Sequence, residues 1–163
     1  MNNITTAQTV ISTPGRKIHQ GKNFLSTDTR DISSSSLFRY GVTTGAESVH
    51  FGYTVSLELD GDALFYKDSD STGAIQNAIF NMNETSNLTT NVQILRNVGV
   101  TTLGNLWDAQ LINGGTTVFS GSRVGSRNEE FILAPNSEYI LEVNNYIAAL
   151  NKITILFGFY NVE

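Results

Sequence analysis

The chain of 163 residues has the length of one domain, and 40% of its residues are hydrophobic, which is enough for a buried core. Its net charge of −5 argues against a nucleic-acid-binding protein, and no apolar run approaches the roughly 20 residues that span a bilayer. The lack of cysteine excludes disulfides, thiolate metal sites and cysteine nucleophiles.

The composition favours strands and turns over long helices. The chain contains 17 Asn, 18 Thr and 15 Ser, together with 14 Gly. All four residue types are poor in helix interiors, because they compete for backbone hydrogen bonds or cost conformational entropy. Charged residues make up only 15% of the chain, so uncharged side chains must supply much of its polar surface. We therefore expect an all-β protein.

The first 30 residues differ in charge from the rest of the chain. They carry a net charge of +3, from four basic residues and one acidic residue: Arg16, Lys17, Lys22, Arg30 and Asp28. Pro14-Gly15 separates an uncharged tip from this basic part. We predict an extended N-terminal arm over residues 1–30 and one β-domain over residues 31–163. A loosely ordered terminus is an equally good interpretation.

From residue 37 onward the pattern predicts short strands. The clearest runs from Phe51 to Asp60, where large apolar residues alternate with polar or small ones, as in a strand with one buried face. Asp60-Gly61 predicts a turn into a return strand at Ala63–Tyr66. The other predicted strands are Leu37–Thr43, Ala74–Met82, Asn91–Leu95, Ala109–Ile112, Thr116–Phe119, Glu130–Leu133, Tyr139–Asn144 and Ile153–Tyr160.

These strands and the turn signals between them predict a β-sandwich with a jelly-roll-like form. One segment, Asn145–Leu150, fits a helical turn or a loop equally well. The N-terminus lacks the charged start and the apolar run of a signal peptide, so we expect synthesis in a cytoplasm.

No residue pattern identifies an enzyme. His19 and His50 have no second ligand at a helical spacing, and the acidic pairs Asp60/Asp62 and Asp68/Asp70 do not continue into the spacing of a calcium-binding EF-hand loop. Solvated turn residues are the simpler interpretation of both pairs. The sequence also lacks a Gly-x-Ser-x-Gly elbow, a P-loop and a dinucleotide fingerprint. We expect no catalytic residue, no cofactor and no metal.

The last predicted strand is apolar on both faces. Ile153, Ile155, Phe157 and Phe159 share one face, and Leu156, Gly158 and Tyr160 share the other. Such a strand is either central to a core or covered by another subunit. We predict that Leu156, Gly158 and Tyr160 form an oligomer interface.

Three segments carry distinctive patterns: Lys17–Phe24, Phe80–Ser86 and Phe131–Asn145, the last followed by Phe157–Tyr160. They resemble segments of small structural proteins of tailed bacteriophages. The first is similar to an Ile-His-x-Gly-x-x-Phe segment near the start of those proteins, and the second to an Asn-x-Asn-x-(Thr/Ser) segment. The third resembles their Leu-x-Pro-Asn-x-x-Tyr-x-Leu-x-(Val/Leu)-x-Asn ending, which an Ile-rich strand closing on aromatic residues follows.

The resemblance implies a non-enzymatic virion protein, commonly a head decoration (cement) protein. It further implies a homo-oligomer, most simply a trimer, bound to the major capsid protein on the outer capsid surface, with neither nucleic acid nor membrane as a partner. We predict that the basic segment docks on the capsid, with Phe24 as an apolar anchor, through Arg16, Lys17, His19, Lys22 and Phe24. The alternative is a phage tail or receptor-binding protein that recognises host glycans. A glycan-acting enzyme is a third interpretation, which no motif favours.

Overall fold

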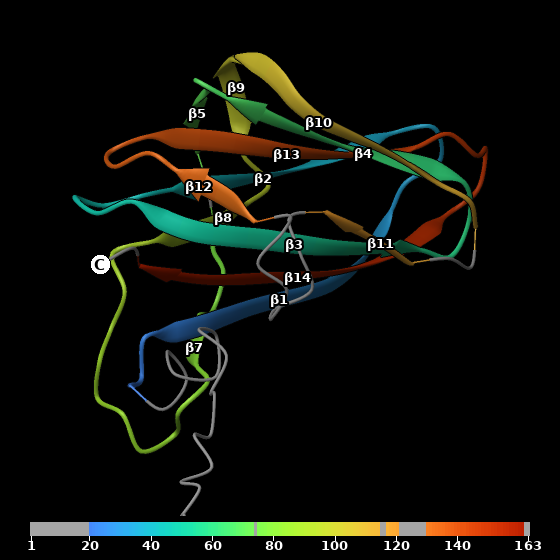
Figure 1. The fold of residues 1–163 in the computed structure, drawn as a ribbon. Coiled ribbons are helices and arrows are strands. Elements are labelled where there is room, and N and C mark those ends of the chain that lie inside the picture. The colour runs from blue at the N-terminus through green and yellow to red at the C-terminus, as the bar shows by residue number, and fades with distance from the viewer. Residues whose placement is uncertain (1–19, 74, 115–116, 121–129, 162–163) are drawn as a thin grey trace, which may run out of the picture.

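The computed structural model is a sandwich of two antiparallel β-sheets (Figure 1). It describes residues 20–73, 75–114, 117–120 and 130–161, with the backbone alone at 117–120. These residues form strands, turns and loops, so the all-β prediction is confirmed. Among them there is no helix long and apolar enough to cross a membrane.

Each sheet has six strands, and a two-stranded ribbon accompanies them. The first sheet has the order β11 (Thr117–Ser120), β3 (Val49–Leu57), β14 (Asn151–Asn161), β1 (Asn23–Ile32) and β7 (Phe80–Asn81), with β12 (Phe131–Leu133) also paired to β3. The second has the order β10 (Asn105–Ile112), β4 (Gly61–Lys67), β13 (Glu138–Asn145), β2 (Leu37–Thr43), β8 (Gln93–Arg96) and β6 (Ile75–Gln76). The ribbon pairs β5 (Asp70–Thr72) with β9 (Gly99–Thr102).

Consecutive long strands alternate between the two sheets. Strands β1 and β3 lie in the first sheet, and β2 and β4 lie in the second. The second half of the chain returns to each sheet, so that β14 lies between β1 and β3 and β13 lies between β2 and β4. The β-sandwich prediction is confirmed, and its jelly-roll-like form stays a prediction. Because β13 and β14 each have a strand on both sides, they form the centres of the two sheets.

An aromatic layer fills the space between the sheets. Phe51, Tyr53 and Phe157 reach it from the first sheet, and Tyr40 and Phe65 reach it from the second; all five are at most 1% exposed. The ring centroids lie 5.6 Å apart for Phe51 and Phe65, 5.4 Å for Tyr53 and Phe65, and 5.5 Å for Tyr40 and Phe157. These rings bridge the two sheets, because each named pair contains one residue from each sheet. Aromatic pairs at such distances add to the energy of simple burial.

The arm predicted for residues 1–30 is too long. Strand β1 begins at Asn23 and pairs with β14 from Asn23↔Tyr160 to Ile32↔Asn151, so residues 23–30 belong to the first sheet. Its inward positions carry Ser26, Asp28 and Arg30 between two apolar residues. Polar residues at inward positions remove the alternation by which a strand is recognised, which is why the sequence pattern does not reveal β1. Residues 1–19 lie outside the described residues.

Two other strand predictions also change. The strand predicted at Ala74–Met82 is two short strands in different sheets, β6 and β7, because the chain crosses from one sheet to the other between them. Asp70, interpreted from the sequence as a solvated turn residue, begins β5, which pairs with β9. Both differences arise where the chain forms short strands of two to four residues, at the edges of the two main sheets (β6 and β7) or in the ribbon (β5 and β9).

Replacing Phe65 should test the aromatic layer directly. Phe65→Ala leaves a cavity between the sheets and should lower the free energy of unfolding by about 3–5 kcal/mol, measured by chemical denaturation. Ile132→Ala is the matched control, because Ile132 is 58% exposed on β12 and its truncation leaves no cavity. Equal losses for the two variants would contradict the packing described.

Candidate functional site

The described residues contain no group of three or more His, Asp or Glu side chains that could hold a metal ion. His50 takes part in a local contact instead. Its ring stacks on Tyr160 with centroids 4.6 Å apart, and its Nδ1 atom lies 2.8 Å from Oε2 of Glu130. The Tyr160 hydroxyl donates to the same carboxylate oxygen at 2.7 Å. The three side chains connect β3, β14 and the residue before β12.

Three of the four carboxylates in the two acidic pairs make structural hydrogen bonds. Asp60 accepts from the Gly114 amide at 2.7 Å, and Asp62 accepts from the Asn144 side-chain amide at 2.7 Å. Asp68 accepts from the Asn105 side chain at 3.1 Å. These bonds connect β4 and its two ends to β13 and to both ends of β10.

The structure corrects the role predicted for Phe24. This side chain is 3% exposed and stacks on Phe159 of β14, with ring centroids 5.8 Å apart. A ring already buried in its own core has almost no surface left to bury against a capsid. Lys22 is part-exposed beside it, and the other three predicted docking residues, Arg16, Lys17 and His19, lie outside the described residues.

The predicted oligomer interface lies on the outward face of β14. Gly158 faces Gly52 across the β14–β3 pairing, and both glycines are buried. Tyr160 is 6% exposed, while Leu156 is partly exposed. Within this trio Leu156 therefore has the most side-chain surface for a second subunit, and the interface stays a prediction.

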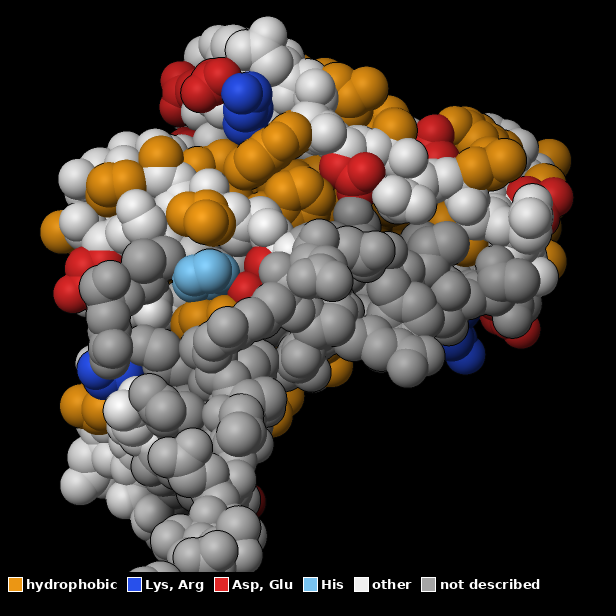
Figure 2. Space-filling model, viewed as in Figure 1, with side chains coloured by type: hydrophobic (Ala, Val, Ile, Leu, Met, Phe, Trp, Pro, Cys, Tyr) orange, Lys and Arg blue, Asp and Glu red, His pale blue; other side chains and the backbone are white. Residues whose placement is uncertain are grey.

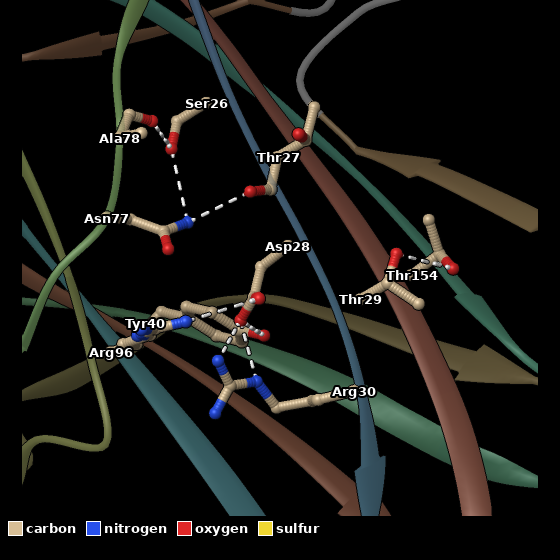
Figure 3. Close-up of polar contacts among 10 residues, drawn as sticks. All are labelled: Ser26, Thr27, Asp28, Thr29, Arg30, Tyr40, Asn77, Ala78, Arg96 and Thr154. Atoms are coloured by element: carbon tan, nitrogen blue, oxygen red, sulfur yellow. Dashed lines mark hydrogen bonds and ion pairs between the residues drawn. The ribbon is translucent and has the colours of Figure 1, made fainter.

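A charged cluster joins the two sheets where β1 faces β2 and β8 (Figure 3). Arg30 Nε donates to Asp28 Oδ2 at 2.6 Å, and the Tyr40 hydroxyl donates to the same oxygen at 3.0 Å. Arg96 Nη1 lies 3.7 Å from the other oxygen of Asp28. The Arg30 guanidinium carbon also lies 4.0 Å from the centroid of the Phe38 ring. Because Arg30, Tyr40 and Arg96 engage both carboxylate oxygens of Asp28, the cluster is best explained as a connection between the two sheets.

Tyr40 is the titratable group that this arrangement affects most clearly. Burial of its side chain raises the pKa of Tyr40 above the ordinary value of 10.0, and the nearby negative charge of Asp28 raises it further. The hydroxyl therefore stays neutral in the folded protein at pH values where it ionises in the unfolded chain.

The outward side chains of the edge strand β10 and its neighbour β4 form an exposed apolar strip. Leu106 lies opposite Tyr66 of β4, Ala109 opposite Leu64, and Leu111 opposite Asp62. Leu106 is 55% exposed and Leu111 is 70% exposed. Figure 2 shows hydrophobic side chains along the upper margin of the view, over β4 and β10. We define the outer strip as Leu64, Leu106, Ala109 and Leu111.

A β-bulge at Trp107 sets the orientation of β10. The register passes from Leu106↔Tyr66 to Asp108↔Phe65, which leaves Trp107 as the extra residue. The Trp107 ring packs at the inner side of the sheet, with its centroid 4.9 Å from that of Phe131. The sequence pattern starts this strand at Ala109, because the adjacent apolar residues Leu106 and Trp107 do not alternate.

The β5–β9 ribbon region covers part of the same outward face. Ile140 of β13 points outward, opposite Tyr66 and Gly41, yet it is fully buried. A Cβ atom on Gly41 would lie 3.2 Å from Val98 Cγ1, so glycine lets the segment beside the ribbon approach closely. The outer strip lies beside this covered area. Its β10 residues Leu106, Ala109 and Leu111 are exposed, and Leu64 of β4 is partly exposed.

No protein-family model matches the chain, and no curated protein sequence matches it.

The geometry of the outer strip indicates what kind of partner the strip can bind. Four neighbouring apolar side chains on one face of a sheet, beside a strand edge with which no second described strand pairs, are typical of a surface that binds another protein. We take the outer strip as the candidate functional surface.

The pKa shift of Tyr40 gives a prediction at alkaline pH. Above about pH 10 the unfolded chain loses the Tyr40 proton while the folded protein retains it, so the free energy of unfolding should fall as pH rises. Tyr40→Phe should make the decrease in the free energy of unfolding with pH less steep, by at most about 1.4 kcal/mol per pH unit. Urea titrations between pH 8 and about 11.5 provide the measurement, since this window spans the ordinary tyrosine pKa.

The variant should also be less stable at neutral pH, because it removes the hydrogen bond to Asp28. Some alkaline dependence should remain, since burial also raises the pKa of Tyr66 and Tyr139. Identical pH slopes for the parent and the variant would show that Tyr40 ionises equally in both states.

Proposed function

We propose that the protein is a bacteriophage virion protein that binds the major capsid protein on the outer head surface and stabilises the capsid lattice. The outer strip serves as its docking surface. The observation that carries this proposal is the exposure of Leu106 and Leu111 on an edge strand. The three segments that resemble small phage structural proteins support the virion assignment.

The edge of β10 adds a second kind of contact to the apolar one. Within the described part of the chain, β4 is the only strand that pairs with β10. The other side of β10 therefore offers backbone donors and acceptors to a strand of the capsid protein. Apolar burial supplies the affinity, and strand pairing fixes the orientation of the bound protein.

When many copies bind one capsid lattice, stable attachment does not require each contact to be strong. Burying a leucine contributes about 1.5–3 kcal/mol, and forming a complex costs at least several kcal/mol in lost motion. A strip of four side chains therefore gives modest affinity for one copy. A homo-oligomer that places several outer strips on neighbouring capsid subunits raises the overall affinity by multivalency.

Introducing negative charge into the outer strip tests the docking surface. Leu106→Asp/Leu111→Asp should reduce co-sedimentation with heads assembled without this protein by at least about tenfold, because two apolar contacts become buried charges. Circular dichroism should show an unchanged fold, since both side chains are exposed. Ile132→Asp, at a similarly exposed residue on β12, is the matched control. Equal binding by the strip variant and the parent would contradict the assignment.

Light scattering tests the predicted oligomer. We expect a mass near three times 17.8 kDa for the full chain, and a lower mass for Leu156→Asp, because Leu156 is the partly exposed member of the predicted interface. A parent protein that stays monomeric both in solution and on heads would contradict the oligomer. If Leu156→Asp keeps the parent mass, the interface lies elsewhere.

A further inference from the structure

A cleft lies at the edge of the sandwich opposite β10. The chain crosses there from β6 in the second sheet to β7 in the first, and then returns to β8. This excursion borders an open cleft with a volume of about 690 Å³ against Phe24 of β1. Residues 76–81 form one wall and residues 86–92 form the other. Its volume lies within the range of small-molecule sites.

The first wall is bonded to both sheets. The Asn77 backbone amide donates to the Ile94 carbonyl of β8 at 2.7 Å. The Asn77 side-chain nitrogen lies 3.2 Å from both Ser26 Oγ and the Thr27 carbonyl oxygen of β1, and donates to both (Figure 3). The Ser26 hydroxyl in turn donates to the Ala78 carbonyl at 2.8 Å. This wall therefore has a fixed position before any ligand arrives.

The second wall is held by one amide and one glycine. The Asn81 side-chain nitrogen donates to the carbonyl oxygens of Gly21 at 2.7 Å and Leu88 at 3.0 Å. Gly21 has a φ of +69°, and a Cβ atom there would lie 2.0 Å from Ser86 Oγ. Only glycine fits this close approach without strain. The cleft is thus largely formed in the free protein, which reduces the ordering cost of binding.

The described residues that line the cleft are uncharged. None of them is a Lys, Arg, Asp, Glu or His. The polar ones carry side-chain amides and hydroxyls, as at Gln76, Asn77, Asn87 and Thr89, and others, such as Ile79 and Leu88, are apolar. Asn77 is 6% exposed, and its amide oxygen accepts no hydrogen bond in the described contacts. A side-chain amide can both donate and accept hydrogen bonds, which suits a ligand whose groups also donate and accept them.

This chemistry disfavours other ligand classes. A phosphate or carboxylate needs basic side chains, and a divalent cation needs carboxylates. A nucleobase needs an exposed aromatic face, but Phe24, the aromatic ring in the lining, is buried against Phe159. Sugar hydroxyls both donate and accept hydrogen bonds, and sugar rings also present apolar C–H faces. Leu88, which is 51% exposed, provides an apolar surface for such a face.

We propose that this cleft binds a neutral saccharide. The amides of Gln76, Asn77 and Asn87 hydrogen-bond to sugar hydroxyls, and Leu88 packs against the ring. The cleft and the outer strip lie at opposite edges of the second sheet, so saccharide binding does not require capsid docking and is tested separately from it.

Amide NMR spectra of the full chain test this proposal with three neutral probes, chitotriose, maltotriose and mannotriose, each up to about 10 mM, which detects millimolar affinity. At least one probe should shift the resonances of both walls, 76–81 and 86–92. Gln76→Ala/Asn87→Ala should weaken that binding by about fivefold or more, because it removes two hydrogen-bonding amides. Asn105→Ala, at an exposed amide on β10, is the matched control and should bind as the parent does.

Among the described residues, neither the Gln76 nor the Asn87 side chain makes a hydrogen bond, and both are exposed, so the double variant should melt at the parent temperature. Three results would overturn the proposal: no shift of the cleft residues with any of the three probes, shifts confined to residues outside the cleft, or equal affinity of the parent and the double variant. Displacement of the saccharide by an uncharged Asn/Ser peptide of comparable affinity would assign the cleft to peptides instead.

Discussion

The aromatic layer between the two sheets is the constraint on which the rest of the structure depends. Phe51 and Phe157 from one sheet and Tyr40 and Phe65 from the other meet at centroid distances near 6 Å and exclude water from the centre. Because interiors pack as densely as organic crystals, these rings fix the spacing and relative position of the sheets. Groups that do not fit between the sheets must lie at the edges or on the outer faces.

The two edges of the sandwich are closed in different ways. At one edge, β1 brings Asp28 and Arg30 toward Tyr40 and Arg96, and Asn77 hydrogen-bonds to strands of both sheets. Polar contacts hold this edge, and the chain that crosses it borders the uncharged cleft. At the other edge, the bulge turns the Trp107 ring onto Phe131, so that apolar packing closes it. The leucines of β10 that alternate with the inward residues then face solvent. The cleft and the outer strip are both consequences of how the sheet edges are closed.

Much of the fold could be predicted from period-two patterns, because central strands bury one complete face. The predicted bounds Leu37–Thr43 agree with β2, and Tyr139–Asn144 lies within β13. Strand β1 was not predicted, because Asp28 and Arg30 occupy inward positions that only their partners in the other sheet make acceptable. The ribbon strands β5 and β9 are too short for an alternating pattern to show.

The site was harder to predict than the fold. Phe24 follows a basic segment and therefore suggested an exposed anchor, whereas its pairing with β14 buries it. Leu106 and Leu111 look like core residues in the sequence, and only the register with β4 places them outside.

The docking role of the outer strip can be measured directly by hydrogen–deuterium exchange of the head-bound and the free protein. We expect new protection over residues 105–112 and unchanged exchange over residues 76–92. Protection of the cleft walls or β14 with unchanged exchange in β10 would contradict it.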